Sequence, residues 1–161
     1  MSRVILGVDP GTRITGYALI SPLDNGFKIL DFGCIKPPPQ LSLPKRYLII
    51  FNAIESLIIK YRPTFLAVET QFMGKNAQSA IKLGMARGSV ILAAEKNGVE
   101  THEYTPKKAK LAITGTGSAS KYQVQRMVQV LLSLSKLPEP EDAADALAIA
   151  VCHAHTMTKP C

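Results

Sequence analysis

The 161-residue sequence contains no tryptophan, and aromatic residues make up only 6% of it. Cysteine is also scarce: Cys34, Cys152 and Cys161 form neither an even set nor a CxxC pair. This argues against a disulfide framework or a zinc site and favours a reducing compartment. No apolar run approaches the ~18–20 residues that a membrane-spanning helix needs. The early Asp9 argues against a secretory signal, so we expect a cytoplasmic protein with no membrane segment.

Acidic residues are scarce as well, with 12 Asp and Glu against 19 Lys and Arg, which gives a net charge of +7. No acid occurs from Thr70 to Ala94 or from Tyr104 to Pro138, although both segments carry basic residues. Such segments attract a phosphate backbone through Coulomb attraction and counterion release. A solvated lysine face is the alternative interpretation. With 47% hydrophobic residues the chain can build a core, and we expect a single domain over residues 1–161.

Apolar periodicity and turn residues divide the chain into strands and helices. We expect strands at residues 3–8, 15–21, 27–35, 65–68 and 99–104, and helices at 43–61, 76–97, 118–132 and 141–155. Asp24-Asn25-Gly26 is typical of a hairpin turn between the second and third strands. Since helices alternate with strands after that hairpin, the pattern predicts an α/β fold, a mixed five-stranded sheet flanked by helices.

Four carboxylates occupy unusual positions. Asp9 and Glu69 each end an apolar strand, where α/β proteins gather their ligands. Asp142 and Asp145 are three residues apart, so they share one face of a helix whose following residues are almost wholly apolar. Carboxylates at apolar positions are costly unless a cation compensates them, and hard oxygen ligands select Mg²⁺ or Mn²⁺. The four acids together therefore predict a divalent-metal site.

Each acid also has a structural explanation. Asp9 begins an Asp-Pro-Gly turn, and Glu69 could pair with a lysine. Asp142 would favour a helix N-terminus through the helix dipole. Asp145 lies deeper in the apolar helix, which makes a structural role harder to assign.

At these residues the sequence resembles the RuvC family of crossover junction endodeoxyribonucleases, the bacterial Holliday-junction resolvases. The blocks that carry the resemblance follow the family's order and are LGVDPGTRITGY at 6–17, ETQFMGKNA at 69–77, KLGMARG at 82–88, GTGSASK at 115–121 and DAADALA at 142–148. The first block alone is weak evidence, because the wider RNase H-like and actin-like kinase superfamilies share it.

The resemblance implies an RNase H-like nuclease domain with Asp9, Glu69, Asp142 and Asp145 as catalytic residues and metal ligands. It implies two Mg²⁺ ions per active site, with Mn²⁺ able to substitute, and symmetric nicking of two like-polarity strands of a four-way DNA junction. The products would carry 5′-phosphate and 3′-hydroxyl ends. The expected biological role is homologous recombination and DNA repair, with the RuvA–RuvB branch-migration complex as a partner.

The resemblance also implies residues that contact DNA. They are an aromatic wedge at Phe72 with its neighbour Met73, basic residues near the scissile phosphate at Lys110 and Lys121, and backbone contacts at Lys75, Lys107 and Lys108. A core position for Phe72 is the alternative.

The resemblance implies a homodimer, and the helix at 76–97 offers a contact for it in a stripe of mostly small residues, namely Ala77, Ala80, Ile81, Gly84, Gly88 and Ile91. Packing of that stripe on its own sheet is the alternative. Three other functions stay open: an RNase H-like nuclease acting on structured RNA, a non-catalytic junction-binding protein, and an actin-like phosphate binder. The last needs two domains that close on ATP, and 161 residues are too few for them.

Overall fold

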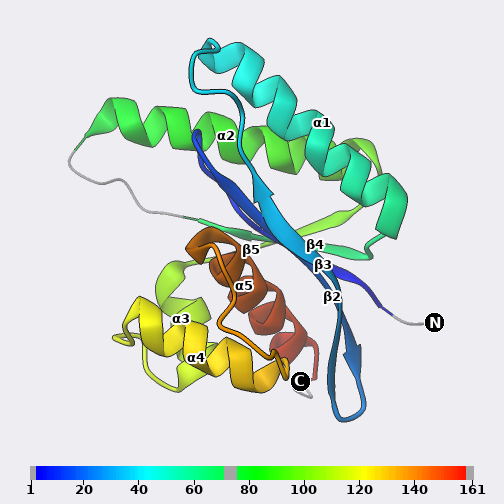
Figure 1. Ribbon diagram of the computed structural model, residues 1–161. Helices are drawn as coiled ribbons and strands as arrows, with labels where there is room; N and C mark the ends of the chain where they lie inside the picture. The colour runs from blue at the N-terminus through cyan, green and yellow to red at the C-terminus, as the bar shows by residue number, and fades with distance from the viewer. Residues whose placement is uncertain (1–2, 71–75, 159–161) are drawn as a thin grey trace.

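The computed structural model describes residues 3–70 and 76–158, which form a central sheet with helices on both faces (Figure 1). In chain order the elements are β1 (Ile5–Asp9), β2 (Thr15–Leu23), β3 (Gly26–Ile35), α1 (Leu43–Tyr61), β4 (Phe65–Glu69), α2 (Ala77–Lys96), β5 (Glu100–Tyr104), α3 (Pro106–Thr114), α4 (Lys121–Leu131) and α5 (Glu141–Thr158).

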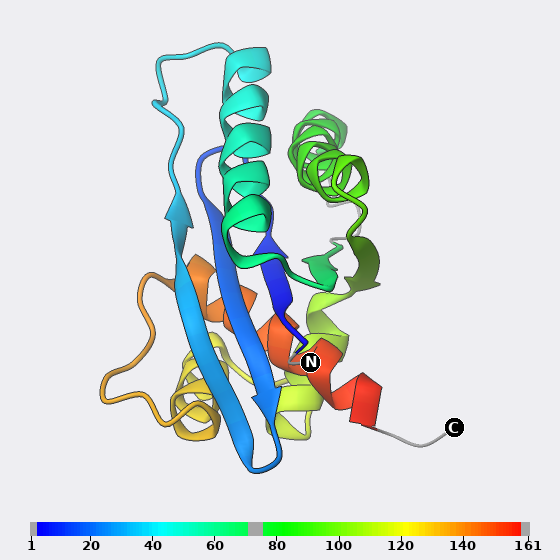
Figure 2. The same cartoon turned by 90° about the vertical axis from the view of Figure 1, so that its right-hand side faces the viewer.

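The sheet has five strands in the order β3-β2-β1-β4-β5. β1 pairs antiparallel with β2, and β2 antiparallel with β3, whereas β1, β4 and β5 run parallel. The long β2–β3 hairpin extends beyond the shorter strands (Figure 2). The expected mixed five-stranded sheet is therefore confirmed.

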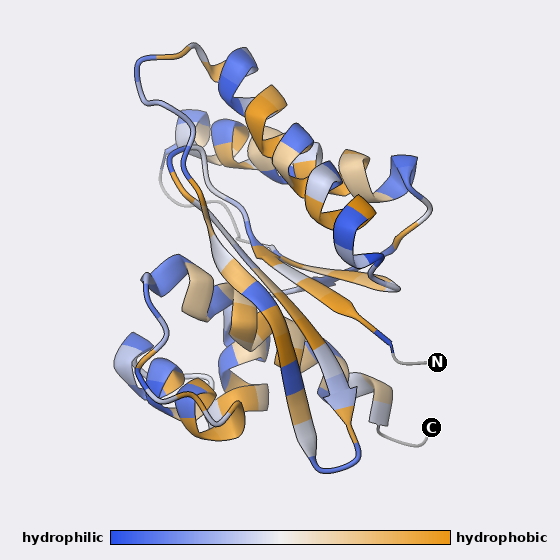
Figure 3. Cartoon of the chain, turned by 45° about the vertical axis from the view of Figure 1, so that its right-hand side comes forward, coloured by the Kyte–Doolittle hydropathy of each residue, from blue (hydrophilic) through white to orange (hydrophobic). Residues whose placement is uncertain are grey.

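Two hydrophobic cores lie on opposite faces of this sheet, because successive strand residues point to opposite sides. Leu6 and Val8 of β1 pack with α1 and α2, whereas Ile5 packs with α3, α4 and α5. Colouring by hydropathy shows apolar stretches along the strands and apolar bands that alternate with polar ones along the helices (Figure 3). α5 is buried from Ala146 to Ala154. In the two described ranges, no helix combines the length and the apolarity needed to cross a membrane.

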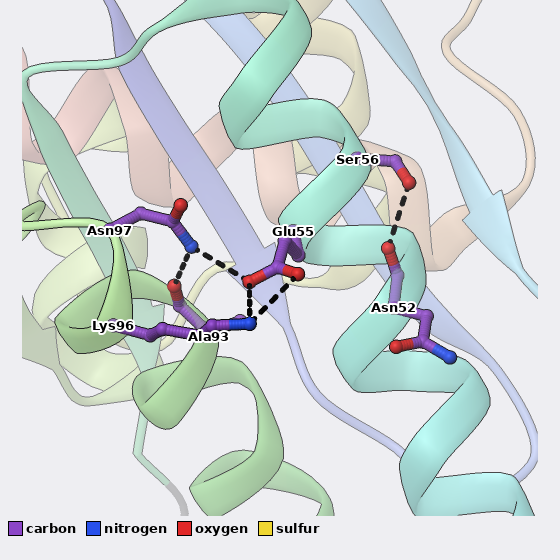
Figure 4. A network of polar contacts seen from close by, with 6 residues as sticks. All are labelled: Asn52, Glu55, Ser56, Ala93, Lys96 and Asn97. Carbon is purple, nitrogen blue, oxygen red and sulfur yellow. Dashed lines mark hydrogen bonds and ion pairs between the residues drawn. The ribbon is translucent and has the colours of Figure 1, made fainter.

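Polar contacts join α1 and α2, the two helices of the upper layer in Figure 1 (Figure 4). Glu55 of α1 accepts hydrogen bonds from Lys96 Nζ at 3.3 Å and from Asn97 Nδ2 at 3.0 Å. Asn97 also donates to the carbonyl oxygen of Ala93 at 2.8 Å, which closes the end of α2. These contacts hold α1 and α2 together as one layer above the sheet.

α3 was not among the expected helices. Its start is capped by Thr105, whose hydroxyl accepts from the N–H of Lys108 at 3.2 Å, and Pro106 occupies the first turn. Its end is set by Gly115 in the left-handed region at φ 81°. Ala109 and Ile113, four residues apart, are its buried positions. Because only these two residues mark the buried face, and lysines surround them, the sequence shows no clear helical periodicity here.

Candidate active site

Asp9 and Glu69 are brought together by the parallel pairing of β1 with β4. Val8 pairs with Val68, so the next residues of the two strands are neighbours at the same edge of the sheet. The two-residue period places Asp9 on the same face as Ile5, and Glu69 on the same face as Ala67. That face is the one covered by α5. Both carboxyl groups are buried, with 6% of Asp9 and 9% of Glu69 exposed.

The third and fourth carboxylates reach this site because α5 packs unusually close to the sheet. A Cβ atom on Gly7 would lie 2.3 Å from the carbonyl oxygen of Ala146, and one on Gly16 would lie 1.9 Å from that of Asp142. Only glycine permits this approach. Gly16 is also the partner of Asp9 in the β1–β2 ladder, so the first turn of α5 lies directly beside Asp9.

All four acids line one pocket of about 570 Å³. They share it with basic side chains and with residues from the β1–β2 turn, and the complete lining is Asp9, Pro10, Gly11, Thr12, Arg13, Ile14, Glu69, Leu83, Pro106, Ala109, Lys110, Lys121, Val124, Asp142, Asp145, Ala148 and Ile149. The structure thus unites residues that are far apart in the sequence into one acidic pocket with a basic border.

Burial and crowding raise the pKa of three of the carboxyl groups, those of Asp9, Glu69 and Asp145. Burial raises the pKa of Asp9, and together with a hydrogen bond to Glu69 and the negative charges of Glu69 and Asp142 it brings that pKa to about 9, although a hydrogen bond to Asp145 opposes the rise. Burial and the negative charge of Asp9 likewise raise the pKa of Asp145, to about 7, against the opposing charge of Lys121. Burial also raises the pKa of Glu69, which the hydrogen bond from Asp9 and the charges of Lys121 and Lys110 oppose. Without compensating cations, this pocket keeps protons at neutral pH.

The four carboxyl groups form an all-oxygen donor set of the kind that hard divalent cations prefer. Three of these groups share protons, because Asp9 is hydrogen-bonded to both Glu69 and Asp145. In the described part of the chain, no three His, Cys, Asp or Glu side chains stand in ligating positions around a common point. The chemistry of the donors fits such a cation, and ligation requires the shared protons to leave.

The lysines expected to contact DNA, whether near the scissile phosphate or along the backbone, divide into two groups. Lys110 of α3 and Lys121 of α4 line the pocket, and Lys121 Nζ is 3.2 Å from Glu141 Oε2. Lys107 and Lys108 are exposed on α3 but do not line the pocket, and Lys108 lies over the ring of Tyr104 at 5.2 Å. Phe72, Met73 and Lys75 lie outside the described residues.

Arg13 also lines the pocket, although the sequence did not predict a role for it. It sits on the β1–β2 turn, which Thr15 closes by donating from Oγ1 to the carbonyl oxygen of Gly11 at 2.8 Å and accepting from its N–H at 3.2 Å. The available signal was its place in the first motif block, four residues after Asp9.

Comparison with known proteins points to one family. The family model described as "Crossover junction endodeoxyribonuclease RuvC" matches residues 5–153. The chain is similar to the protein of that name from Protochlamydia amoebophila, at 56% identity over 114 residues, which cover 71% of this chain and 68% of that relative. It is also similar to the one from Citrifermentans bemidjiense, at 48% identity over 71% of this chain and 70% of the relative.

Solved structures agree. T. thermophilus RuvC in complex with a Holliday junction substrate superposes with a TM-score of 0.91 at 34% identity, covering 96% of this chain and 94% of that one. The yeast mitochondrial Holliday junction resolvase Ydc2 shares the fold, with a TM-score of 0.67 at 14% identity over 92% of this chain and 77% of the other. The expected RNase H-like fold is thereby confirmed. With its four carboxylates in one pocket, the chain belongs to the crossover junction endodeoxyribonuclease RuvC family.

Proposed function

We propose that this protein resolves four-way DNA junctions by hydrolysing one phosphodiester in each of two strands of like polarity. The convergence of Asp9, Glu69, Asp142 and Asp145 on one pocket is the observation that carries the proposal. A protein that only binds DNA would have no use for four acids in one pocket, because ionised carboxylates repel phosphate. The expected location is the cytoplasm, where the chromosomal junctions of recombination and repair occur.

In this proposal the four acids hold two Mg²⁺ ions, or Mn²⁺ in their place. When bound, such ions supply a nucleophilic hydroxide at neutral pH and stabilise the leaving oxygen. The chain itself orients the ligands: β1 and β4 present Asp9 and Glu69, and α5 presents the other two. Products with 5′-phosphate and 3′-hydroxyl ends follow from breaking the bond on the 3′-oxygen side of the phosphorus.

Lys110 and Lys121 would neutralise the phosphate as it enters this acidic pocket. Both lie close enough to Glu69 for their charges to lower its pKa. Lys107 and Lys108, exposed on the same helix as Lys110, would contact the backbone farther from the cut. Phe72 as wedge, Met73 and Lys75 remain part of the proposal on the resemblance alone.

Cutting two strands requires two active sites, and we place the dimer contact on α2. Its outer surface exposes Ile81, Met85 and Leu92, at 66%, 54% and 62%. Between them, Gly84 and Gly88 face open space, so a second helix could approach closely. The helix packs on its own sheet with a different face, through Ala86, Val90, Ala93 and Ala94. The RuvA–RuvB complex stays the expected partner in branch migration.

Cleavage and binding of a labelled immobile junction, measured separately, test the proposal. We expect Asp9→Asn and Asp145→Asn each to reduce Mg²⁺-dependent cleavage by on the order of 100-fold or more while binding persists. Asp24→Asn is the matched control, because Asp24 is an exposed acid of the β2–β3 turn away from the pocket. Cleavage retained in both aspartate variants would contradict the assigned residues.

The choice of substrate separates the remaining alternatives. The wild-type protein should cleave a four-way DNA junction faster than linear duplex DNA or structured RNA of equal length. Faster cleavage of the RNA would make the chain an RNA nuclease, and binding without cleavage at any divalent concentration would make it a non-catalytic junction-binding protein.

A further inference from the structure

A second cleft, of about 850 Å³, adjoins the carboxylate pocket. The two hollows share Thr12, Arg13 and Ile14, so the β1–β2 turn forms the border between them. Four cationic side chains line the second cleft: Arg13, Lys36, Arg46 and Lys82. No carboxylate of the described residues lines it, which sets it apart from its neighbour.

The four cations come from separate segments that meet only in the folded chain. Arg13 lies on the β1–β2 turn, Lys36 directly follows β3, Arg46 belongs to α1 and Lys82 to α2. Arg46 is held in place, since its Nε donates to the carbonyl oxygen of Leu41 at 3.0 Å and its Nη2 donates to that of Pro39. Because a guanidinium has five N–H donors, this anchoring leaves three of them for a ligand.

These charges are not neutralised within the described residues. Lys96 pairs with Glu55 and Lys121 with Glu141, but none of the four cations of the cleft forms an ion pair with a described carboxylate. The start of α1 adds positive potential, because its first turn holds no acidic residue and Ser42 makes no capping hydrogen bond through its side chain. Basic residues at a helix start oppose the helix dipole, so an anion in the cleft would relieve the repulsion.

We propose that this basic cleft, defined by Arg13, Lys36, Arg46 and Lys82, binds the phosphodiester backbone of the junction DNA beside the phosphate that is cut. The inference rests on the proposed nuclease function. The cleft is larger than the carboxylate pocket, and its cations are spread over four segments, which suits several phosphates in a row better than one small anion. Continuity across the Arg13 turn lets one strand occupy both hollows.

The test uses the two exposed lysines, because Arg46 supports the loop before α1 and its loss could unfold that loop. The variant is Lys36→Ala with Lys82→Ala. The matched control is Lys28→Ala with Lys60→Ala, which removes the same charge at the far ends of β3 and α1. Affinity for an immobile junction is measured in Ca²⁺ from 50 to 200 mM salt, and single-turnover cleavage is measured in Mg²⁺ at saturating protein.

In a plot of the logarithm of the binding constant against the logarithm of the salt concentration, the slope (the salt slope) should be about two units shallower for the cleft variant than for the wild type. Between 50 and 200 mM salt, the variant should therefore lose roughly tenfold less affinity than the wild type loses. Its affinity at low salt should be weaker for junctions of any sequence, with the saturated cleavage rate kept. The control should match the wild type in all three measurements.

The proposal would be overturned if the cleft variant kept the affinity and the salt slope of the wild type. It would also be overturned if the control variant lost as much affinity as the cleft variant. A lower saturated rate with unchanged affinity would also overturn it. In each case junction cleavage by the wild type would leave the proposed function standing, whereas a wild type that cleaves no junction would remove the proposed function itself.

Discussion

The carbonyl oxygen of Asp142 occupies the space that a side chain on Gly16 would need, only 1.9 Å from where its Cβ atom would lie. Gly16 pairs with Asp9 across the β1–β2 ladder. The missing side chain therefore sets how closely α5 approaches the sheet at the position where two of the four carboxylates meet.

Replacing Gly16 with alanine should damage the pocket more than the fold. A methyl group there meets backbone rather than a movable side chain, so the first turn of α5 must shift away from Asp9. Overpacking of this kind costs about 1–3 kcal/mol of the free energy of unfolding. We expect Gly16→Ala to stay folded by circular dichroism but to lose most junction cleavage. Gly33→Ala is the control, since its methyl group meets only the movable Tyr17 ring; equal activity of both variants would contradict the argument.

Stability should depend on pH and on Mg²⁺ together. The folded state raises the pKa of Asp9 from 3.8 to about 9, so its contribution to stability is present below pH 4 and is lost as the pH rises towards 9. The metal-free protein should thus melt at a lower temperature at pH 8.5 than at pH 6, and Mg²⁺ should restore more stability at pH 8.5 because it replaces protons.

Asp9→Asn supplies the comparison for this experiment. At pH 8.5 without metal the variant should melt higher than the wild type, because the buried side chain at position 9 no longer has to ionise, and Mg²⁺ should add little to it. A shift of roughly 2–4 °C corresponds to about 1 kcal/mol in a chain of this size. If Mg²⁺ raised the melting temperature by the same amount at both pH values, or in both proteins, the carboxylates would not be its ligands.

Dimerisation should depend on the exposed face of α2. Met85→Glu, at 54% exposure between Gly84 and Gly88, would place a charge at the centre of a two-fold contact and its copy opposite it. We expect this variant to be monomeric by light scattering at concentrations where the wild type is dimeric. Leu48→Glu is the control, because Leu48 is 58% exposed on α1. A dimeric Met85→Glu protein would place the contact elsewhere.

His153 should make the fold sensitive to acid independently of the active site. It is buried, its Nδ1 lies 2.5 Å from the Tyr104 hydroxyl, and its Nε2 has no hydrogen-bond partner in the described part of the chain. Burial and, to a lesser extent, the nearby His102 together lower the pKa of His153 from 6.5 to about 4. Protons therefore bind the unfolded state first, so stability is lost as the pH falls from 6.5 to 4.

The comparison of wild type with His153→Phe isolates this effect from the carboxylates. In urea unfolding, the wild type should lose up to about 3 kcal/mol more than the variant between pH 7 and pH 4, the value that a shift of this size implies. Parallel stability curves for the two proteins would show that His153 does not titrate in this way.

Much of the site was predictable because local pattern and ligand chemistry agree. Apolar strands that end on Asp9 and Glu69 placed two acids at strand ends, and the spacing of Asp142 and Asp145 placed two more on one helix face. α3 was missed because only Ala109 and Ile113 mark its buried face, among lysines that suggested a charged segment. From the sequence, the small-residue stripe of α2 could pack either on a second copy of the helix or on its own sheet. In the structure Ala86 and Val90 face the sheet, so Gly84 and Gly88 face outwards.

By itself the sequence determined the element types, the basic character of the chain and the motifs that mark its family, because these depend on neighbouring residues and on composition. Only the tertiary structure decided that four acids share one pocket and that Arg13 joins this pocket to a cleft whose charged side chains are all basic. The register of β1 with β4 and the contact of Gly16 with α5 link residues more than 50 positions apart along the chain. Such pairings arise from packing across the whole sheet, which no local period encodes.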